Sequence, residues 1–282
     1  MKIAISAEST IDLTQDLIEK YNINIVPFHI VLGDKEYEDD KVTTDEIIEF
    51  VDKNKILPKT SAVNEVQFET AFSKLLKTYD AVIHFSLSSN ISSAYDNAYR
   101  VAEKYKQVYV VDTKSLSTGI ALLAIFAAKL AENGEKPENI VEKCLARVPQ
   151  VQASFVLKRL DYLYKGGRCN SLAYFGANLL KLRPQILVKD GKMQSGKKYR
   201  GNFERVVDNY CKDTLEQFDT PDLEEAFITY TTADDATIQI AYNALKEKGF
   251  KNIHITRAHG TITSHCGENC LGILYINDGE NN

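Results

Sequence analysis

Tryptophan is absent from the sequence, methionine occurs only twice, and positive charge is not in excess. The 34 lysines and arginines are outnumbered by 39 aspartates and glutamates, which gives a net charge of -5. A nucleic-acid-binding surface is usually strongly basic, so we expect no nucleic-acid partner. Long apolar runs are also lacking, because the longest candidate, Ile120–Ala128, is much shorter than the roughly twenty residues of a membrane-spanning helix. We therefore expect no transmembrane segment.

Export signals and cysteine patterns give a second set of exclusions. Residues 1–10 lack the long apolar core of a signal peptide and are typical of a buried first strand, so we expect a cytoplasmic protein. The five cysteines are odd in number and scattered, as is usual for reduced thiols. His265, Cys266 and Cys270 lie close in sequence, but no second Cys or His pair completes a zinc site. We expect neither a metal nor another cofactor.

The order of the predicted elements changes at Pro149. Before it, strands alternate with helices, which favours parallel βαβ units; after it, hairpin-like segments are mixed with helices. We predict an α/β fold with a parallel-sheet domain at residues 1–150 and a second α+β domain at 151–282. The predicted strands cover residues 2–7, 24–30, 80–85, 107–111, 151–157, 185–188, 192–199, 226–230, 252–257 and 271–276.

Several local patterns give sharper predictions. Asn64 and Gln67 have the spacing of a capping box at a helix start. The predicted helix 117–133 is apolar nearly all round, so it should be buried. Asp190-Gly191 is typical of a two-residue hairpin turn. The paired carboxylates Asp39-Asp40 are interpreted as surface residues.

Hydroxyl side chains gather where predicted strands end. They occur at Ser9-Thr10, within 86–93 and within 112–117, and Thr60-Ser61 lie in a predicted loop just before a helix. Ligands of parallel sheets bind at the carboxyl ends of the strands, and helix N-termini there favour anions. A helix needs only one cap, so several hydroxyls at one edge indicate an anion site rather than caps alone.

A second candidate feature is the turn Gly166-Gly167 followed by Arg168. The two glycines allow a tight turn, and the planar guanidinium placed after it suits a carboxylate or phosphate. His265, just before Gly267, could meet the same ligand. The flanks of the turn are apolar: Leu160, Leu163, Leu172, Phe175, Leu179 and Leu180. A fixed cation beside apolar surface indicates an amphiphilic ligand.

Two sequence patterns are candidates for catalytic sites. Ser92, His265 and Asp112 could form a hydrolase triad, but the sequence contains no G-x-S-x-G elbow. Residues 191–198 nearly form a phosphate-binding loop, yet Lys198 occupies the position of the magnesium-binding hydroxyl. Neither pattern is complete.

Several segments together follow one recognisable pattern. They are Pro58–Ser61, 88–95, Val111-Asp112, 160–168, Leu179-Leu180 with Pro184, 198–201, and His265-x-Gly267. This pattern resembles the DegV family of bacterial fatty-acid-binding proteins, essentially from end to end. The Gly-Gly-Arg segment with its leucine-rich flanks is its most specific part.

The resemblance implies a two-domain protein that holds one long-chain fatty acid, such as palmitate, in a tunnel between the domains. It implies that Thr60 and Ser92 hold the carboxylate, with Ser61 and Ser93 nearby. The resemblance places Arg168 and His265 at the same end: Arg168 comes from the Gly-Gly-Arg turn and His265 from the C-terminal motif. It further implies a non-catalytic lipid carrier that can present the carboxylate to a separate fatty-acid kinase. The alternatives are an acyl-ester hydrolase and a dihydroxyacetone-kinase-like protein, although the sequence shows no nucleotide site.

The chain departs from the family pattern at some of these motifs. Glu8-Ser9 stands where Asp-Ser is usual, and Ala62–Asn64 replaces Gln-Pro-Ser. Ser93 stands where glycine is usual, so it either crowds the head group or adds a hydroxyl to it. Gly267–Asn269 replaces Gly-Pro-Gly, which affects the surface offered to a partner.

Overall fold

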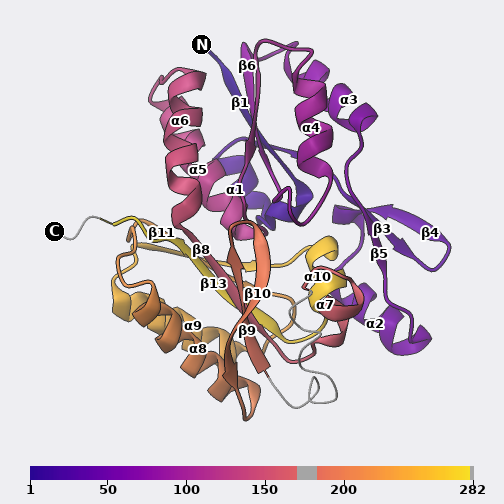
Figure 1. Ribbon diagram of the computed structural model, residues 1–282, viewed down its shortest axis with the longest axis vertical. Helices are drawn as coiled ribbons and strands as arrows, with labels where there is room; N and C mark the ends of the chain where they lie inside the picture. Colours follow the sequence, from indigo (N-terminus) through magenta and orange to yellow (C-terminus); the bar gives the residue numbers. More distant parts are fainter. Residues whose placement is uncertain (170–182, 280–282) are drawn as a thin grey trace.

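The computed structural model describes residues 1–169 and 183–279 (Figure 1). Of the apolar flanks of the Gly-Gly-Arg turn, Leu172, Phe175, Leu179 and Leu180 lie outside these residues. Within the described ranges, no helix is both long and apolar enough to cross a membrane.

The first sheet has four parallel strands in the order β2-β1-β6-β7. Its strands are β1 (Ile3–Glu8), β2 (Ile23–Val26), β6 (Ala81–Ser86) and β7 (Val108–Asp112). Every residue of β6 is buried, as expected for a strand covered on both faces. The prediction of a parallel sheet in the first part of the chain is confirmed.

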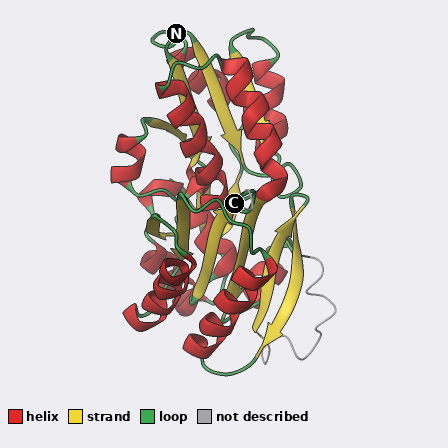
Figure 2. Cartoon of the chain, turned by 90° about the vertical axis from the view of Figure 1, so that its left-hand side faces the viewer, coloured by secondary structure: helices red, strands yellow, loops and turns green. Residues whose placement is uncertain are grey.

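Helices flank the first sheet on both sides, as the side view of Figure 2 shows for the upper part of the molecule. They are α1 (Gln15–Lys20), α3 (Glu65–Leu75), α4 (Ala94–Ala102), α5 (Thr118–Glu132) and α6 (Pro137–Arg147). The capping box of Asn64 and Gln67 at the start of α3 is confirmed. The helix predicted to be buried, α5, packs against β1 and β6 and also against strands of the second sheet. It therefore belongs to the core that joins the two sheets.

The second sheet is mixed, with the order β10-β9-β8-β13-β11-β12. Only β11 and β12 are parallel; its other neighbouring strands run antiparallel. Its strands are β8 (Val151–Leu157), β9 (Arg183–Lys189), β10 (Lys192–Tyr199), β11 (Glu225–Tyr230), β12 (Asn252–Arg257) and β13 (Cys270–Ile276). The predicted turn at Asp190-Gly191 joins β9 and β10, with φ of 51° and 77°.

Alternate residues of the second sheet enter two different cores. Phe155 and Leu274 belong to the core shared with α5 and the first sheet. Val156 and Ile273 belong to a second core with α8 (Phe203–Gln217) and α9 (Asp235–Lys248). Both helices lie below the sheet in Figure 1. The mixed sheet confirms the predicted α/β class with a second α+β part. The boundary near residue 150 remains a prediction, although β8 follows it directly.

A small antiparallel sheet extends to the right in Figure 1, in the order β4-β3-β5. Its strands are β3 (His29–Leu32), β4 (Lys35–Glu38) and β5 (Lys59–Ser61). Four short elements complete this region: η2 (Asp39–Lys41), α2 (Thr44–Asn54), α7 (Asp161–Lys165) and α10 (Gly260–Cys266). Helix α10 contacts α2, α7, β3 and β5, so residues from both ends of the chain meet here.

Local predictions were wrong at several points of this region. The single strand expected at residues 24–30 is divided between β2 and β3, because Pro27 has no N–H for a ladder. Residues 59–61 form strand β5 rather than a loop, since β3 supplies a pairing edge. Residues 9–11, which follow the first predicted strand, form the short helix η1 (Ser9–Ile11), and α1 begins only at Gln15. The helix α10 was not expected.

Candidate functional site

A cavity of about 600 Å³ lies where the two large sheets and the small sheet meet. Its wall includes the loops that follow β6 and β7, strand β5, the carboxyl end of β11, and helix α10. Its volume falls in the range of about 300–1,000 Å³ that small-molecule sites occupy. The cavity is therefore large enough to hold a ligand.

All six residues predicted for the site line this one cavity. Thr60 and Ser61 come from β5, and Ser92 and Ser93 from the loop before α4. Arg168 follows α7, and His265 lies within α10. Much of the remaining wall is apolar: Phe28, Leu87, Ile91, Leu116, Phe155, Leu163, Met193, Ile262 and Leu274. Residues 120–128, the longest apolar run of the sequence, belong to the core or pack against it.

His265 is the most constrained polar residue of the wall. Its Nε2 lies 3.0 Å from Thr60 Oγ1, and its Nδ1 is buried without a protein partner. Loss of solvent around the ring, and secondly the nearby Arg168 cation, lower the pKa of His265 to about 4. The imidazole is therefore neutral at pH 7 and has one N–H to donate.

The Gly-Gly-Arg turn is placed against this imidazole. A Cβ at Gly166 would lie 2.6 Å from His265 Nδ1, so only glycine leaves room for the ring. Gly167 has a φ of 70°, which a glycine adopts without strain. Arg168 Nη1 donates to the carbonyl of Gly166 at 2.7 Å, which holds the exposed guanidinium at the cavity wall.

The hydroxyls of the cavity wall differ in depth and in availability. Thr60 and Ser92 are half-buried, whereas Ser61 and Ser93 are exposed. Ser92 Oγ accepts the N–H of Ala94 at 3.2 Å, which leaves the hydroxyl hydrogen able to donate elsewhere. Ser93 precedes α4 but its side chain makes no capping bond. These hydroxyls can therefore donate to an anion bound in the cavity.

A fully buried cluster of polar side chains holds the start of the loop at residues 87–93, which follows β6. Glu8, at the end of β1, accepts the backbone N–H of Leu87 at 2.9 Å and the hydroxyl of Ser86 at 2.6 Å. His84 lies 3.2 Å from the same carboxylate and 2.9 Å from Ser6. Sequence reasoning missed this role of Glu8, because nothing in one strand shows which neighbour its side chain will face.

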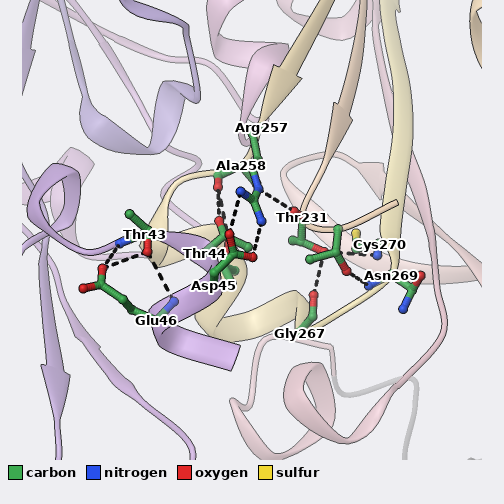
Figure 3. Close-up of polar contacts among 12 residues, drawn as sticks. Thr43, Thr44, Asp45, Glu46, Thr231, Arg257, Ala258, Gly267, Asn269 and Cys270 are labelled. Atoms are coloured by element: carbon green, nitrogen blue, oxygen red, sulfur yellow. Dashed lines mark hydrogen bonds and ion pairs between the residues drawn. The ribbon is translucent and has the colours of Figure 1, made fainter. Parts of the chain in front are cut away.

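The segments on both sides of α10 are held by polar contacts, shown in Figure 3. Before the helix, Thr44 donates to the carbonyl of Ala258 at 2.8 Å, and Arg257 pairs with Asp45 of α2. After it, the Thr231 hydroxyl donates to the carbonyl of Gly267 at 2.7 Å. Helix α10 is thus tied to elements from both parts of the chain.

The comparisons with known proteins decide the family. A family model described as an uncharacterised protein of the DegV family matches residues 2–278. The chain belongs to the DegV family. A Thermotoga maritima relative named fatty acid-binding protein is 30% identical over 96% of both chains. A DegV domain-containing protein of Clostridium acetobutylicum is 29% identical over 98% of both.

Solved DegV structures share the whole fold of this DegV-family chain. A DegV lipid-binding protein from Thermotoga maritima has a TM-score of 0.84 and 28% identity, covering 98% of this chain and 99% of that one. A structure described as fatty-acid binding by a DegV family protein of Thermus thermophilus has a TM-score of 0.90, 24% identity and coverage of 98% and 100%. The second match shows the fold alone.

The hydrogen bonds of this DegV-family chain do not assemble the hydrolase triad considered from the sequence. His265 Nε2 contacts Thr60, the Ser92 hydroxyl accepts from Ala94, and Asp112 accepts from the backbone N–H groups of Ser89 and Lys114. The segment that resembled a phosphate-binding loop is strand β10, whose hairpin tip is bonded to Ser88 and Asn90. In these described segments, neither the catalytic triad nor the phosphate-binding loop is formed.

The interpretation of Asp39 as a surface residue is wrong. Its side chain is fully buried, and its Oδ1 accepts the N–H of Thr261 at 2.6 Å. The cause is α10, whose start lies over η2.

Cys266 and Cys270 also line the cavity. None of the described residues form a group of three or more His, Cys, Asp or Glu that could hold a metal ion.

Proposed function

We propose that this protein binds one long-chain fatty acid in the cavity, with the carboxylate near Thr60, His265 and Arg168 and the acyl chain along the apolar wall. The observation that carries the proposal is the composition of this cavity, which combines the neighbouring polar groups of Thr60, His265 and Arg168 with a largely apolar remainder. We call the wall around these three residues the polar end. The fatty-acid-binding description of a relative 30% identical over 96% of both chains supports it.

The charges and donors of the polar end suit a carboxylate. Arg168 supplies a cation, the neutral His265 can donate one N–H, and the hydroxyls of Thr60 and Ser92 can rotate to donate. Hydrogen bonds to a charged group contribute about 1.5–3 kcal/mol each. Each buried methylene adds roughly 0.8 kcal/mol, so a long acyl chain can dominate the affinity.

We propose a carrier role without turnover of its own. Ser61, Ser93 and Arg168 are exposed while lining the cavity, so these residues are accessible to a partner. A carboxylate held there could be presented to a separate fatty-acid kinase, which would form the acyl phosphate. The cytoplasm would be the compartment for this exchange, and no cofactor is needed for binding.

Native mass spectrometry of the purified protein tests the binding proposal. We expect a mass excess equal to one fatty acid, which disappears after extraction with organic solvent and returns after addition of palmitate. A sample extracted with the same solvent and refilled with a C16 fatty alcohol serves as the comparison for head-group selectivity. Protein that carries no lipid and takes up no added palmitate would contradict the proposal.

A further inference from the structure

Two aspartates from the N-terminal part of the chain cap helix α10. Asp12 Oδ1 accepts the backbone N–H of His259 at 2.7 Å, and Asp39 Oδ1 accepts that of Thr261 at 2.6 Å. The residue that precedes α10, His259, makes no side-chain capping bond itself. Free N–H groups at a helix start need acceptors and favour negative charge. The acceptors here come from 247 and 222 residues away.

Both aspartates are themselves held in place. Asp12 follows η1 in the left-handed region, with a φ of 54°, and its Oδ2 accepts the hydroxyl of Ser117 at 2.5 Å. Asp39 lies in η2, where its own N–H donates to the carbonyl of Phe28 at 2.9 Å. Ser117 lines the cavity, so Asp12 bridges the start of α5 and the start of α10. The two carboxylates therefore connect the start of α10 to two fixed positions in the N-terminal part of the chain.

Burial of these two carboxylates costs more free energy than an ordinary helix cap at the surface does. Both side chains are fully buried, and loss of solvent raises the pKa of Asp12 and of Asp39. Asp234 does the same task for α9 from the surface, by accepting the N–H of Thr237 at 2.7 Å. A surface cap stabilises a helix without a burial penalty, so burial of two carboxylates at one short helix indicates a demand for position.

Helix α10 carries the part of the cavity wall that must be positioned. Thr261, Ile262, His265 and Cys266 all line the cavity. Residues four apart lie on the same face of a helix, so a shift at Thr261 moves His265 as well. We propose that Asp12 and Asp39 are positioning residues, which set α10 so that His265 reaches Thr60 and the ligand head group. For the ligand this inference rests on the proposed function.

Binding assays separate positioning from general stability. The variants are Asp12→Ala, Asp39→Ala, Asp12→Asn and Asp39→Asn, with Asp234→Ala as the matched control on α9. The probes are a fluorescent C16 fatty acid and the corresponding fatty alcohol. We expect each alanine variant to bind the acid about ten-fold more weakly and the alcohol with little change. The asparagine variants keep an acceptor oxygen and should recover most of the affinity, and Asp234→Ala should lower only the melting temperature.

A second readout needs no ligand. The titration of the His265 ring is followed by NMR of histidine-labelled apo protein, where its pKa is about 4 in the native arrangement. We expect that pKa to rise toward the ordinary value in the alanine variants, because a displaced α10 admits water, and to stay unchanged in Asp234→Ala. If an alanine variant does not fold, Asp12→Leu or Asp39→Leu takes its place, because leucine fills a similar buried volume without an acceptor oxygen.

The two readouts keep the inference and the proposed function apart. If the native protein binds neither probe, the proposed function fails, and the His265 titration still decides whether the aspartates position the ring. Folded variants of Asp12 and Asp39 that lack an acceptor oxygen, yet keep a native His265 titration and a native ratio of acid to alcohol affinity, would overturn the inference.

Discussion

Thr60 Oγ1 and His265 Nε2 lie 3.0 Å apart although 205 residues separate them in the chain. One belongs to strand β5 of the small sheet and the other to helix α10. Neither partner is fixed by its own element alone, since β5 is only three residues long and α10 only seven. The polar end of the cavity therefore forms only when the two ends of the chain are correctly assembled.

Removal of the Thr60 hydroxyl should weaken binding of a fatty acid. In Thr60→Ala the carboxylate loses a donor and His265 Nε2 loses its partner, so we expect roughly ten-fold or greater loss of affinity. Thr60→Ser keeps the hydroxyl and should bind nearly as the native protein does. Titration with a fluorescent C16 fatty acid measures the effect, and the fatty alcohol of equal length should respond far less. Equal affinities for the alanine and serine variants would place the carboxylate elsewhere.

Thr60 and Ser92 should not act independently. Ser92→Ala alone should also weaken binding by about ten-fold, because its hydroxyl hydrogen remains free to donate. Both hydroxyls serve one carboxylate, so the double variant should lose less than the sum of the two single losses in binding free energy. A double-mutant cycle on the same probe measures this coupling. Strictly additive losses would mean that the two hydroxyls contact separate groups.

Arg168 should matter more for transfer than for binding. Its guanidinium is exposed and is already bonded to the carbonyl of Gly166, so water can take part of its place at the carboxylate. We expect Arg168→Ala to reduce acyl-phosphate formation by a cognate kinase more than it reduces fatty-acid affinity. Both assays are run on one preparation, with Arg159→Ala, whose side chain pairs with Asp161, as the control. A complete loss of binding equal to the loss of transfer would contradict this expectation.

Periodicity and turn residues were sufficient to predict many of the regular elements of the fold. Strand β12 has the predicted bounds, Asn252–Arg257, and α5 is as buried as its apolar sequence indicates. Such elements depend on residues close in sequence. The predictions failed where a distant partner decides the outcome: β5 is a strand because β3 pairs with it.

At the candidate site, too, the sequence indicated residue types but not the contacts that depend on distant partners. Residue type and chain order could indicate hydroxyls, Arg168 and His265, and the structure brings them to one cavity. They could not indicate that Asp39 is buried, because its acceptor role depends on Thr261 of a helix formed 222 residues later. They also could not show that Glu8 holds the loop at Leu87, which follows from the pairing of β1 with β6.

Asp12 should make the stability of the apo protein fall as pH rises from about 4 toward 7. Burial raises its pKa from 3.8 to about 7, and the neighbouring Asp39 also raises it, whereas His259 and Ser117 lower it. Between these two pH values the folded state holds a proton that the unfolded chain has lost. This contribution is fully present below pH 3.8 and lost as pH rises through about 7, by at most roughly 1.4 kcal/mol per pH unit.

Asp12→Asn isolates this contribution. The amide oxygen can accept the His259 N–H and the amide nitrogen can donate to Ser117, so the fold is kept while the titration is removed. We expect the melting temperature of the variant, relative to the native protein, to increase between pH 4.5 and pH 7.5. Asp234→Asn is the contrast, because hydrogen bonds from Thr237 lower the pKa of Asp234 and its stabilisation is lost on acidification instead. Parallel melting curves for Asp12→Asn and the native protein across this range would show that Asp12 does not titrate there.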